Sequence, residues 1–286
     1  MSELSKPHNK LLRLNDLAVI AGDGELPKLI CAEMNKLSIR PWIFFPANIK
    51  VENPSNLNQV SFDPLDLEGL FLELRKRKIR EIVFAGKITR QNLKYAKSRN
   101  LDNLFYNKIY PILQQTDDQI LRRIGDIFES HGFNIRSVTE LLPGALASKG
   151  NLTRKVPSRQ DKNDITKAIE YHNILSKSDI GQSLIVSDGL CLAIETMPGT
   201  DAMLDFAKHI RGKNCPQDVE TGIFYKAPKT SQDMRFDIPV IGETTIEKVK
   251  KAKLKGIALK KNAVILLNKE EIIRLANELC IFVVMV

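Results

Sequence analysis

The sequence is poor in several residue types that mark particular protein classes. Its 286 residues include four cysteines, one tryptophan and only 6% aromatic residues. The cysteines lie far apart, with no Cys-x-x-Cys pair and no histidine at zinc-ligand spacing, so neither a disulfide framework nor a zinc site is expected. Glycine and proline are spread without a period, which excludes collagen-like and low-complexity chains.

Long hydrophobic runs are also missing. The first residues, MSELSKPHNKLLRLND, contain no apolar stretch of signal-peptide length, so secretion is not expected. The longest uninterrupted apolar runs, such as the closing IFVVMV, are far too short to span a bilayer. We therefore expect a cytoplasmic protein with reduced thiols, whose contact with a membrane would be peripheral.

Positive charge is what the chain has in excess. Lysine and arginine number 43 against 34 acidic residues, a net charge of +9. Such a surface favours anionic partners: nucleic acid, phosphorylated metabolites or an anionic membrane face. The lysine-rich stretch 248–261 is first of all a solvated helix face, although Lys248, Lys251 and Lys255 share one side and would suit a membrane. Nucleic acid is less well supported, because no aromatic residue is interleaved with these lysines.

Short apolar runs alternate with helical periodicity along most of the chain, which favours an α/β architecture with parallel strands. The stretch from Gly144 to Asn163 becomes small, basic and polar, and we place a domain boundary there, at about residue 150. The predicted fold is therefore α/β in two domains. Residues 1–150 form a Rossmann-like parallel sheet, and residues 151–286 form a mixed α/β domain with the candidate catalytic acid.

Three local signals make specific predictions. The dipeptide Asp188-Gly189 between two apolar runs predicts a type I′ hairpin. Thr116 is expected to cap the helix that follows it. Thr244, with Glu247 three residues later, matches a capping box at the start of the lysine-rich helix.

A predicted strand followed by Gly22-Asp23-Gly24 and a helix can present backbone N–H groups to an anion. A dinucleotide fingerprint needs a third glycine where this chain has Pro27, and an acid after the second strand, which here ends without one. Three hypotheses for this loop therefore remain open. It binds a phosphate or diphosphate, it is a plain tight turn, or, as the poorest match, it binds NAD. Gly86 ends another predicted parallel strand and is expected at the same edge of the sheet.

Several acidic residues can serve a phosphate or a metal ion, and each has a plainer explanation. Asp117 and Asp118 open a predicted helix, as Asp201 does after Thr200, and carboxylates favour the positive end of a helix. Glu195 ends a predicted strand, where a buried carboxylate is costly unless it is paired or metal-bound. Exposure of Glu195 at the sheet edge is equally open.

The segment Tyr225–Gly242, YKAPKTSQDMRFDIPVIG, is the richest in candidate chemistry. Lys226, Lys229 and Arg235 can neutralise phosphate oxygens. Asp237 directly precedes a predicted strand, where a rigidly held carboxylate can bind Mg²⁺ or orient water. The plain alternative is a basic loop in which Asp237 is a turn residue.

Five segments occur in an order that resembles one family. They are IAGDGELP, VFAGKITR, DDQILRRIGDIFESHGF, SDIGQSLIVSDGLCLAIETMPGTDAML, and KAPKTSQDMRFDIPVIG followed by the lysine-rich helix. From about Leu17 to Val286 the chain is similar to the UDP-2,3-diacylglucosamine pyrophosphatases of lipid A biosynthesis, the bacterial type unrelated to calcineurin-like metallophosphoesterases. The long central segment and the Gln-Asp-x-Arg-x-Asp-x-Pro-x-Ile-Gly motif are its specific parts.

The resemblance implies Mg²⁺-dependent hydrolysis of the diphosphate in UDP-2,3-diacylglucosamine, in which water attacks the sugar-side phosphorus. The products are 2,3-diacylglucosamine 1-phosphate (lipid X) and UMP. It also implies two α/β domains that enclose the lipid-linked substrate. We expect such an enzyme in the cytoplasm at the inner face of the inner membrane, and a homodimer is one expectation for its assembly.

The resemblance and the basic segment together assign roles to individual residues. Asp237 is the leading candidate for catalysis. The residues expected to bind substrate are Gly22, Asp23, Gly24, Leu26, Pro27, Ala85, Gly86, Gln182, Thr200, Lys226, Lys229 and Arg235. The expected Mg²⁺ ligands are Asp237, Asp118, Asp201 and Glu195.

The residues themselves are compatible with this chemistry, because diphosphate hydrolysis needs positioning and charge neutralisation more than a covalent nucleophile. No convincing Ser/His/Asp arrangement is visible, and the histidines (His8, His131, His172, His209) fall in the N-terminal tail or in helices. The net charge and the glycine loop leave a non-catalytic nucleotide or nucleic-acid binding protein as the alternative. A nucleotide-dependent oxidoreductase is the third reading.

Overall fold

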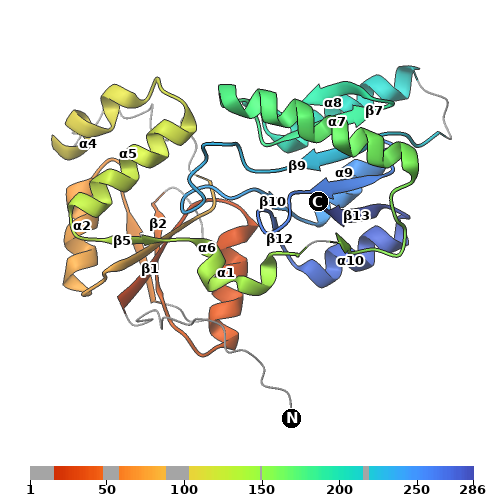
Figure 1. Ribbon diagram of the computed structural model, residues 1–286. Coiled ribbons are helices and arrows are strands. Elements are labelled where there is room, and N and C mark those ends of the chain that lie inside the picture. The colour runs from red at the N-terminus through yellow and green to blue at the C-terminus, as the bar shows by residue number, and fades with distance from the viewer. Residues whose placement is uncertain (1–15, 48–57, 88–102, 149, 215–218) are drawn as a thin grey trace, which may run out of the picture. The chain divides into compact units, whose positions relative to one another are not determined.

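A computed structural model describes residues 16–47, 58–87, 103–148, 150–214 and 219–286. The chain forms two compact units, divided between Leu141 and Leu142 (Figure 1). Both units are α/β, as predicted. The composition placed the boundary a little later, at about residue 150. His8 and Cys215 lie outside the described residues, whereas Cys31, Cys191 and Cys280 carry free thiols.

The N-terminal unit contains a five-stranded parallel sheet in the order β3-β2-β1-β4-β5. Its elements are β1 (Leu17–Ala21), α1 (Glu25–Lys36), β2 (Trp42–Pro46), β3 (Asn58–Phe62), α2 (Leu67–Lys76), β4 (Glu81–Ala85), α4 (Asn103–Lys108), α5 (Asp117–Ser130), β5 (Asn134–Arg136) and α6 (Val138–Leu141). The strand order reverses between β1 and β4, so the loops that follow these two strands lie side by side at the carboxyl edge. This is the predicted Rossmann-like arrangement.

Helices of this unit turn apolar faces to the sheet. On α5 the side chains of Ile120, Ile127 and Phe128 are buried. Phe128 meets Phe71 of α2 edge to face, with 4.9 Å between ring centroids. Thr116 caps α5 in a capping box with Gln119, which confirms the predicted cap. The sequence did not point to β3, because only one of its five residues, Val60, is aliphatic.

The C-terminal unit contains a six-stranded mixed sheet in the order β6-β13-β11-β9-β7-β8, and a two-stranded sheet of β10 and β12. Its elements are β6 (Gly150–Asn151), α7 (Arg159–Leu175), β7 (Ser183–Ser187), β8 (Leu190–Ile194), α8 (Thr200–Asn214), β9 (Ile223–Lys226), β10 (Val240–Ile241), α9 (Glu243–Lys251), β11 (Gly256–Leu259), β12 (Ile265–Leu266), α10 (Lys269–Glu278) and β13 (Phe282–Met285). Strands β9, β11 and β13 are parallel, whereas β7 runs antiparallel to β9 and to β8.

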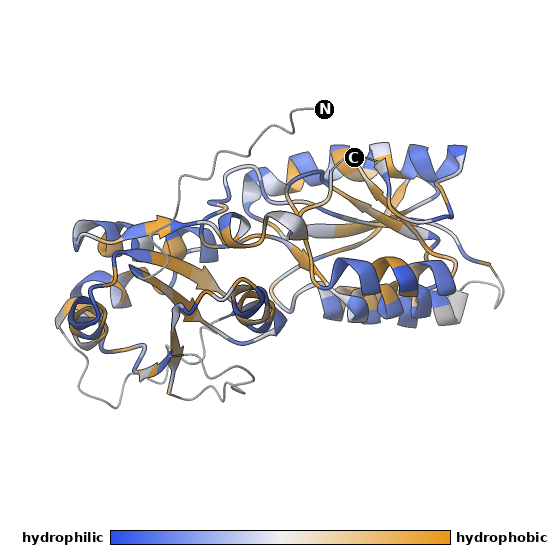
Figure 2. Ribbon diagram, turned by 90° about the horizontal axis from the view of Figure 1, so that it is seen from below, coloured by the Kyte–Doolittle hydropathy of each residue, from blue (hydrophilic) through white to orange (hydrophobic). Residues whose placement is uncertain are grey.

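Alternation along the strands divides the core of this unit into two layers. Ile185 and Phe224 face the buried side chains of α8, α9 and α10, and their neighbours Leu184 and Tyr225 face α7. Figure 2 shows the matching pattern, with hydrophobic strands between helices that are hydrophilic on their outer faces. Burial on both sides explains why these strands read as continuous apolar runs.

The β7–β8 hairpin is held by a buried carboxylate. Asp188 and Gly189 have φ of 54° and 80°, which confirms the turn predicted from this dipeptide. Asp164 of α7 is fully buried and accepts hydrogen bonds from the N–H groups of both turn residues, at 3.2 and 2.7 Å. The turn is thereby fixed against α7.

The lysine-rich helix α9 begins earlier than predicted. Its N-cap is Gly242, whose N–H donates to the hydroxyl of Thr245, so the capping box expected at Thr244 and Glu247 is wrong. The glycine accepts the extended conformation at the helix start, and the chain enters the helix two residues sooner.

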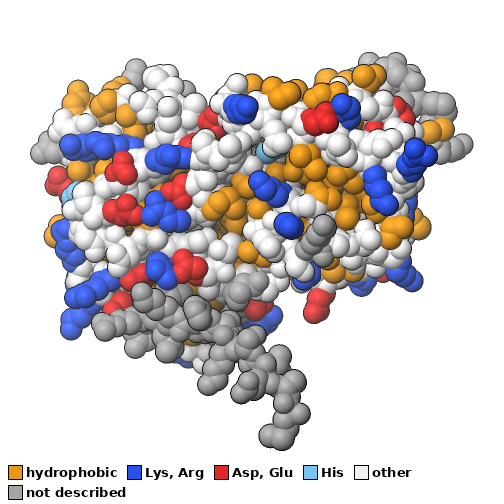
Figure 3. Space-filling model, viewed as in Figure 1, with side chains coloured by type: hydrophobic (Ala, Val, Ile, Leu, Met, Phe, Trp, Pro, Cys, Tyr) orange, Lys and Arg blue, Asp and Glu red, His pale blue; other side chains and the backbone are white. Residues whose placement is uncertain are grey.

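Acidic neighbours compensate part of the positive charge on α9. Lys248 and Lys251 form ion pairs with Asp205 and Glu247, at 2.6 and 3.5 Å. On the face in view in Figure 3, basic and acidic side chains of the N-terminal unit are intermixed rather than gathered in one basic stripe. Within the described ranges, no helix is long and apolar enough to cross a membrane.

Gly86→Ala is expected to destabilise the protein more than Gly132→Ala. Both glycines have φ of +88°, where alanine costs about 1–2 kcal/mol. A Cβ at Gly86 would lie 2.7 Å from the carbonyl oxygen of Asp23, whereas a Cβ at Gly132 would meet no atom within 4 Å. Urea unfolding followed by circular dichroism measures the difference in the free energy of unfolding. Equal losses of stability in the two variants would contradict the expected clash between a Cβ at Gly86 and the first loop.

Asp164→Asn is expected to lower the stability of the C-terminal unit by roughly 1–3 kcal/mol, since an amide nitrogen would replace one of two buried acceptor oxygens. Asn163→Ala, at an exposed position of the same helix, is the matched control and should change stability by less than about 0.5 kcal/mol. Thermal denaturation of both variants tests this. A stability of Asp164→Asn equal to the control would refute the role of the carboxylate.

Candidate active site

In the N-terminal unit the two predicted loops are joined through their backbones. Gly22 N–H donates to the carbonyl of Ala85 at 2.7 Å, and Asp23 exchanges two hydrogen bonds of 2.8 Å with Lys87. A Cβ at Gly22 would lie 2.5 Å from the Lys87 carbonyl oxygen, so only glycine permits this approach. The expectation that Gly86 and the first loop share one edge of the sheet is confirmed.

Internal contacts engage the backbone groups on which the phosphate hypothesis depends. The N–H groups of Gly22 and Asp23 donate within the protein, and Gly24 N–H donates to the carboxylate of Asp23 at 2.8 Å. The carboxylate of Asp23 thus places a negative charge beside the start of α1, which disfavours a second anion there. Leu26 and Pro27 are buried on the inner face of α1, where they pack. Phosphate binding by this loop stays a prediction.

Asp118, also in this unit, lies in the first turn of α5 and forms an ion pair with Arg122 at 2.8 Å. The helix end and this arginine account for its position without a metal ion. Its role as a metal ligand stays a prediction.

In the C-terminal unit the antiparallel placement of β7 collects predicted site residues at one edge of the sheet. Ser183 at the start of β7 pairs with Lys226 at the end of β9. Ala227 N–H donates to the carbonyl of Gln182, and Glu195 N–H donates to the carbonyl of Ser183, both at 2.9 Å. The Ser183 hydroxyl also donates to the Glu195 carboxylate. Gln182, Glu195 and Lys226 therefore lie close together.

Asp237 joins this edge through two glutamine amides. The side-chain amide of Gln182 donates to Asp237 Oδ2 at 2.7 Å. Gln232 donates to the same oxygen at 2.5 Å and to the Asp237 carbonyl at 2.8 Å. Gln232 was not among the predicted residues, although it lies within the specific motif. The two amides determine where the carboxylate lies.

Lys226 is the most unusual charged residue of the edge. Its side chain is 94% buried, since only 6% is exposed, and its ammonium donates to the hydroxyl of Thr200 at 2.7 Å. Thr200 is the first residue of α8, so a buried cation stands at the positive end of a helix. Both favour negative charge at this place, and phosphate contact by Lys226 and Thr200 stays a prediction.

The other two predicted phosphate ligands already have carboxylate partners. Lys229 pairs with Asp179, and both side chains are largely buried. Arg235 contacts both carboxylate oxygens of Asp233, the shorter contact being 2.8 Å. These pairs hold the loop between β9 and β10, and phosphate contact by Lys229 or Arg235 stays a prediction.

His172 was set aside on sequence grounds, but it lies beside this edge. Its side chain is 4% exposed, and its Nε2 has no hydrogen-bond partner. Burial lowers the pKa of the imidazole, while the backbone of Ala227 and the charge of Glu195 act in the opposite direction. The signal was present, because His172 continues the inward spacing of Ile165 and Ala168 on α7.

The four expected metal ligands are not gathered into one ready-made site. No cluster of three or more His, Cys, Asp or Glu side chains suited to a metal ion occurs among the residues that the structure describes. Glu195 is bonded to Ser183, and Asp201 is exposed on α8. Asp237 is the carboxylate best held in place, and one or two carboxylates suffice for Mg²⁺ when phosphate oxygens complete its shell.

Comparison with known proteins agrees with both units. Residues 16–145 match the family model described as LpxI N-terminal domain, and residues 148–284 match the LpxI C-terminal domain. The chain is also 33% identical over 222 residues to the UDP-2,3-diacylglucosamine pyrophosphatase LpxI of Caulobacter vibrioides. That alignment covers 75% of this chain and 77% of the relative. Since the two models follow one another over nearly the whole sequence, this chain belongs to the LpxI family.

Proposed function

We propose that this protein hydrolyses the diphosphate of UDP-2,3-diacylglucosamine, releasing 2,3-diacylglucosamine 1-phosphate and UMP for lipid A biosynthesis. Membership of the LpxI family and the name of the Caulobacter relative support the substrate. The observation that carries the chemistry is the oriented carboxylate of Asp237, connected through Gln182 to the strand edge that holds the buried Lys226.

Charge neutralisation is the first task of such a site. A diphosphate carries negative oxygens that repel an attacking water, and hydrolysis becomes easier when fixed positive groups offset this charge. The Lys226 ammonium and the first turn of α8 provide such groups without reorganisation, because the lysine is buried and bonded to Thr200. We therefore propose that one phosphate of the substrate binds at this edge, beside Lys226 and the first turn of α8.

Asp237 is proposed to hold Mg²⁺ or to orient the attacking water. Gln182 and Gln232 donate to one of its oxygens and so restrict rotation of the carboxylate. The donor chemistry suits Mg²⁺, which prefers oxygen ligands, and when bound the ion would neutralise phosphate oxygens. Glu195, Asp201 and Asp118 are weaker candidates, since Glu195 is bonded to Ser183, Asp201 is exposed on α8 and Asp118 is paired with Arg122.

The proposed step transfers one phosphorus between two oxygens. The water oxygen forms a bond to the sugar-side phosphorus, and the bond from that phosphorus to the bridging oxygen breaks. UMP leaves with the bridging oxygen, and the water protons pass to the surrounding bases and solvent.

Because the substrate carries acyl chains, we also propose that the reaction takes place at the inner face of the inner membrane through a peripheral contact.

Asp237→Asn is expected to lower kcat for UMP release by at least about 100-fold, since the amide cannot hold a divalent cation or accept a proton as the carboxylate does. Glu247→Gln, an exposed acid of α9, is the matched control and should retain wild-type activity. A coupled assay of UMP release from UDP-2,3-diacylglucosamine measures both. Wild-type rates in Asp237→Asn would remove the assignment of this residue, and an inactive but folded wild-type protein would refute the proposed function.

Removal of divalent cations is expected to abolish UMP release, and added Mg²⁺ should restore it. The physical reason is that the phosphate oxygens would lose the cation that completes their neutralisation. Titration of Mg²⁺ after treatment with EDTA gives the apparent affinity of the enzyme for Mg²⁺. This affinity should be weaker in a variant of Asp237 that retains some activity. Undiminished hydrolysis in excess EDTA would contradict the assignment of Mg²⁺.

A further inference from the structure

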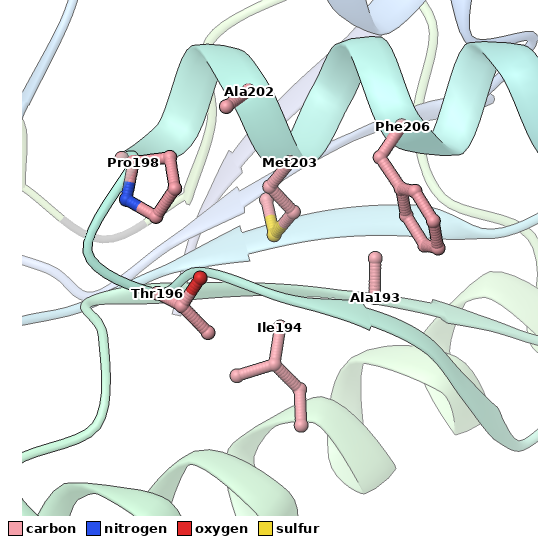
Figure 4. Close-up of a pocket in the computed structure, with 8 residues that line it drawn as sticks. Ala193, Ile194, Thr196, Pro198, Ala202, Met203 and Phe206 are labelled. Atoms are coloured by element: carbon pink, nitrogen blue, oxygen red, sulfur yellow. The ribbon is translucent and has the colours of Figure 1, made fainter.

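An apolar groove lies between the end of β8 and the first turns of α8. Its volume is about 290 Å³, and most of its lining is hydrophobic (Figure 4). The lining includes Ala193 and Ile194 of β8, Pro198 of the connection, and Ala202, Met203 and Phe206 of α8. In Figure 4 the side chains of Met203 and Phe206 point from the helix towards the strand.

Large hydrophobic side chains around this groove are open to solvent. Phe206 is 53% exposed, and Met197 in the connecting turn is 96% exposed. Burial of apolar area is worth about 25 cal/mol per Å², so a group of such side chains in one place marks a surface that an apolar ligand can cover.

The groove borders the polar edge described above. Gly199 lines the groove, and the next residue, Thr200, accepts the hydrogen bond from the buried Lys226. On the strand side, Ile194 lines the groove, and the next residue, Glu195, is bonded to Ser183. Along both the strand and the helix, residues of the polar edge therefore follow directly after residues that line the apolar groove, an arrangement that complements a polar head group with an alkyl chain.

We propose that this groove binds one acyl chain of the lipid-linked substrate, and that Phe206 and Met203 contact the chain away from the head group. The proposal rests on the proposed function, because it uses the diphosphate at Lys226 as the polar anchor. Phe206 follows Thr200 by six residues, about 9 Å along the helix axis. The groove is at the small end of ligand sites, so it has room for part of one chain and not for the whole lipid.

Ala202→Trp tests this assignment, because Ala202 is exposed on α8 and an indole there would fill the groove without entering the core. The KM for the long-chain substrate is expected to rise at least about tenfold with little change in kcat. Tenfold corresponds to about 1.4 kcal/mol, the burial of roughly two methylene groups. The KM for the diacetyl analogue, which has no long chain, should change by less than about twofold.

Lys208→Trp, at an exposed position of the same helix that does not line the groove, is the matched control. Phe206→Ser is a second variant that removes an apolar wall instead of filling the channel, and it should also raise the KM for the long-chain substrate. Circular dichroism of all three variants checks folding.

The outcomes separate the two proposals. Wild-type hydrolysis with an unchanged long-chain KM in Ala202→Trp and Phe206→Ser would overturn the groove assignment and leave the proposed function standing. Absence of UMP release by the wild-type protein would overturn both. A dimer that Ala202→Trp converts to a monomer at unchanged KM would show that a second copy covers the groove, which also overturns the assignment.

Discussion

The side chain and backbone of Gln182 connect the parts of the candidate active site. Its carbonyl accepts the N–H of Ala227, which continues the pairing of β7 with β9, and its amide donates to Asp237. The position of the carboxylate therefore depends on the register of two antiparallel strands. Because a shift of one residue would turn Gln182 to the other face of the sheet, the buried pattern of β7 indirectly holds Asp237 in place.

The positive charge of the chain has two different uses. On the surface, lysines of α9 pair with acids of the same helix and of neighbouring segments, which fits a solvated helix face more simply than a site for nucleic acid. Inside, Lys226 is buried at the start of α8, where its ammonium donates to Thr200. Because a buried charge is costly unless it is paired and hydrogen-bonded, the surroundings of this one lysine are more informative than the net charge of +9.

Local signals in the sequence predicted local structure well. The turn at Asp188-Gly189, the cap at Thr116 and the apolar strands follow from backbone preferences and periodicity, and the structure has them. The cap at Thr244 failed because glycine at 242 can begin the helix equally well. The glycine loop is the instructive case, since its sequence predicts exposed N–H groups, but a second loop distant in the chain engages two of them.

The sequence by itself determined the α/β class, the division into two units and, through its motifs, the family. It also pointed to Gln182, Glu195, Thr200, Lys226 and Asp237 of the C-terminal edge, but not to Ser183, Gln232 or His172. Only the tertiary structure decided which of them meet: Lys226 with Thr200, and Asp237 with Gln182 and Gln232. The physical reason is that spacing along the chain specifies helices and strands, whereas the contacts of Lys226 with Thr200 and of Asp237 with Gln182, 26 and 55 positions apart, depend on strand order and packing.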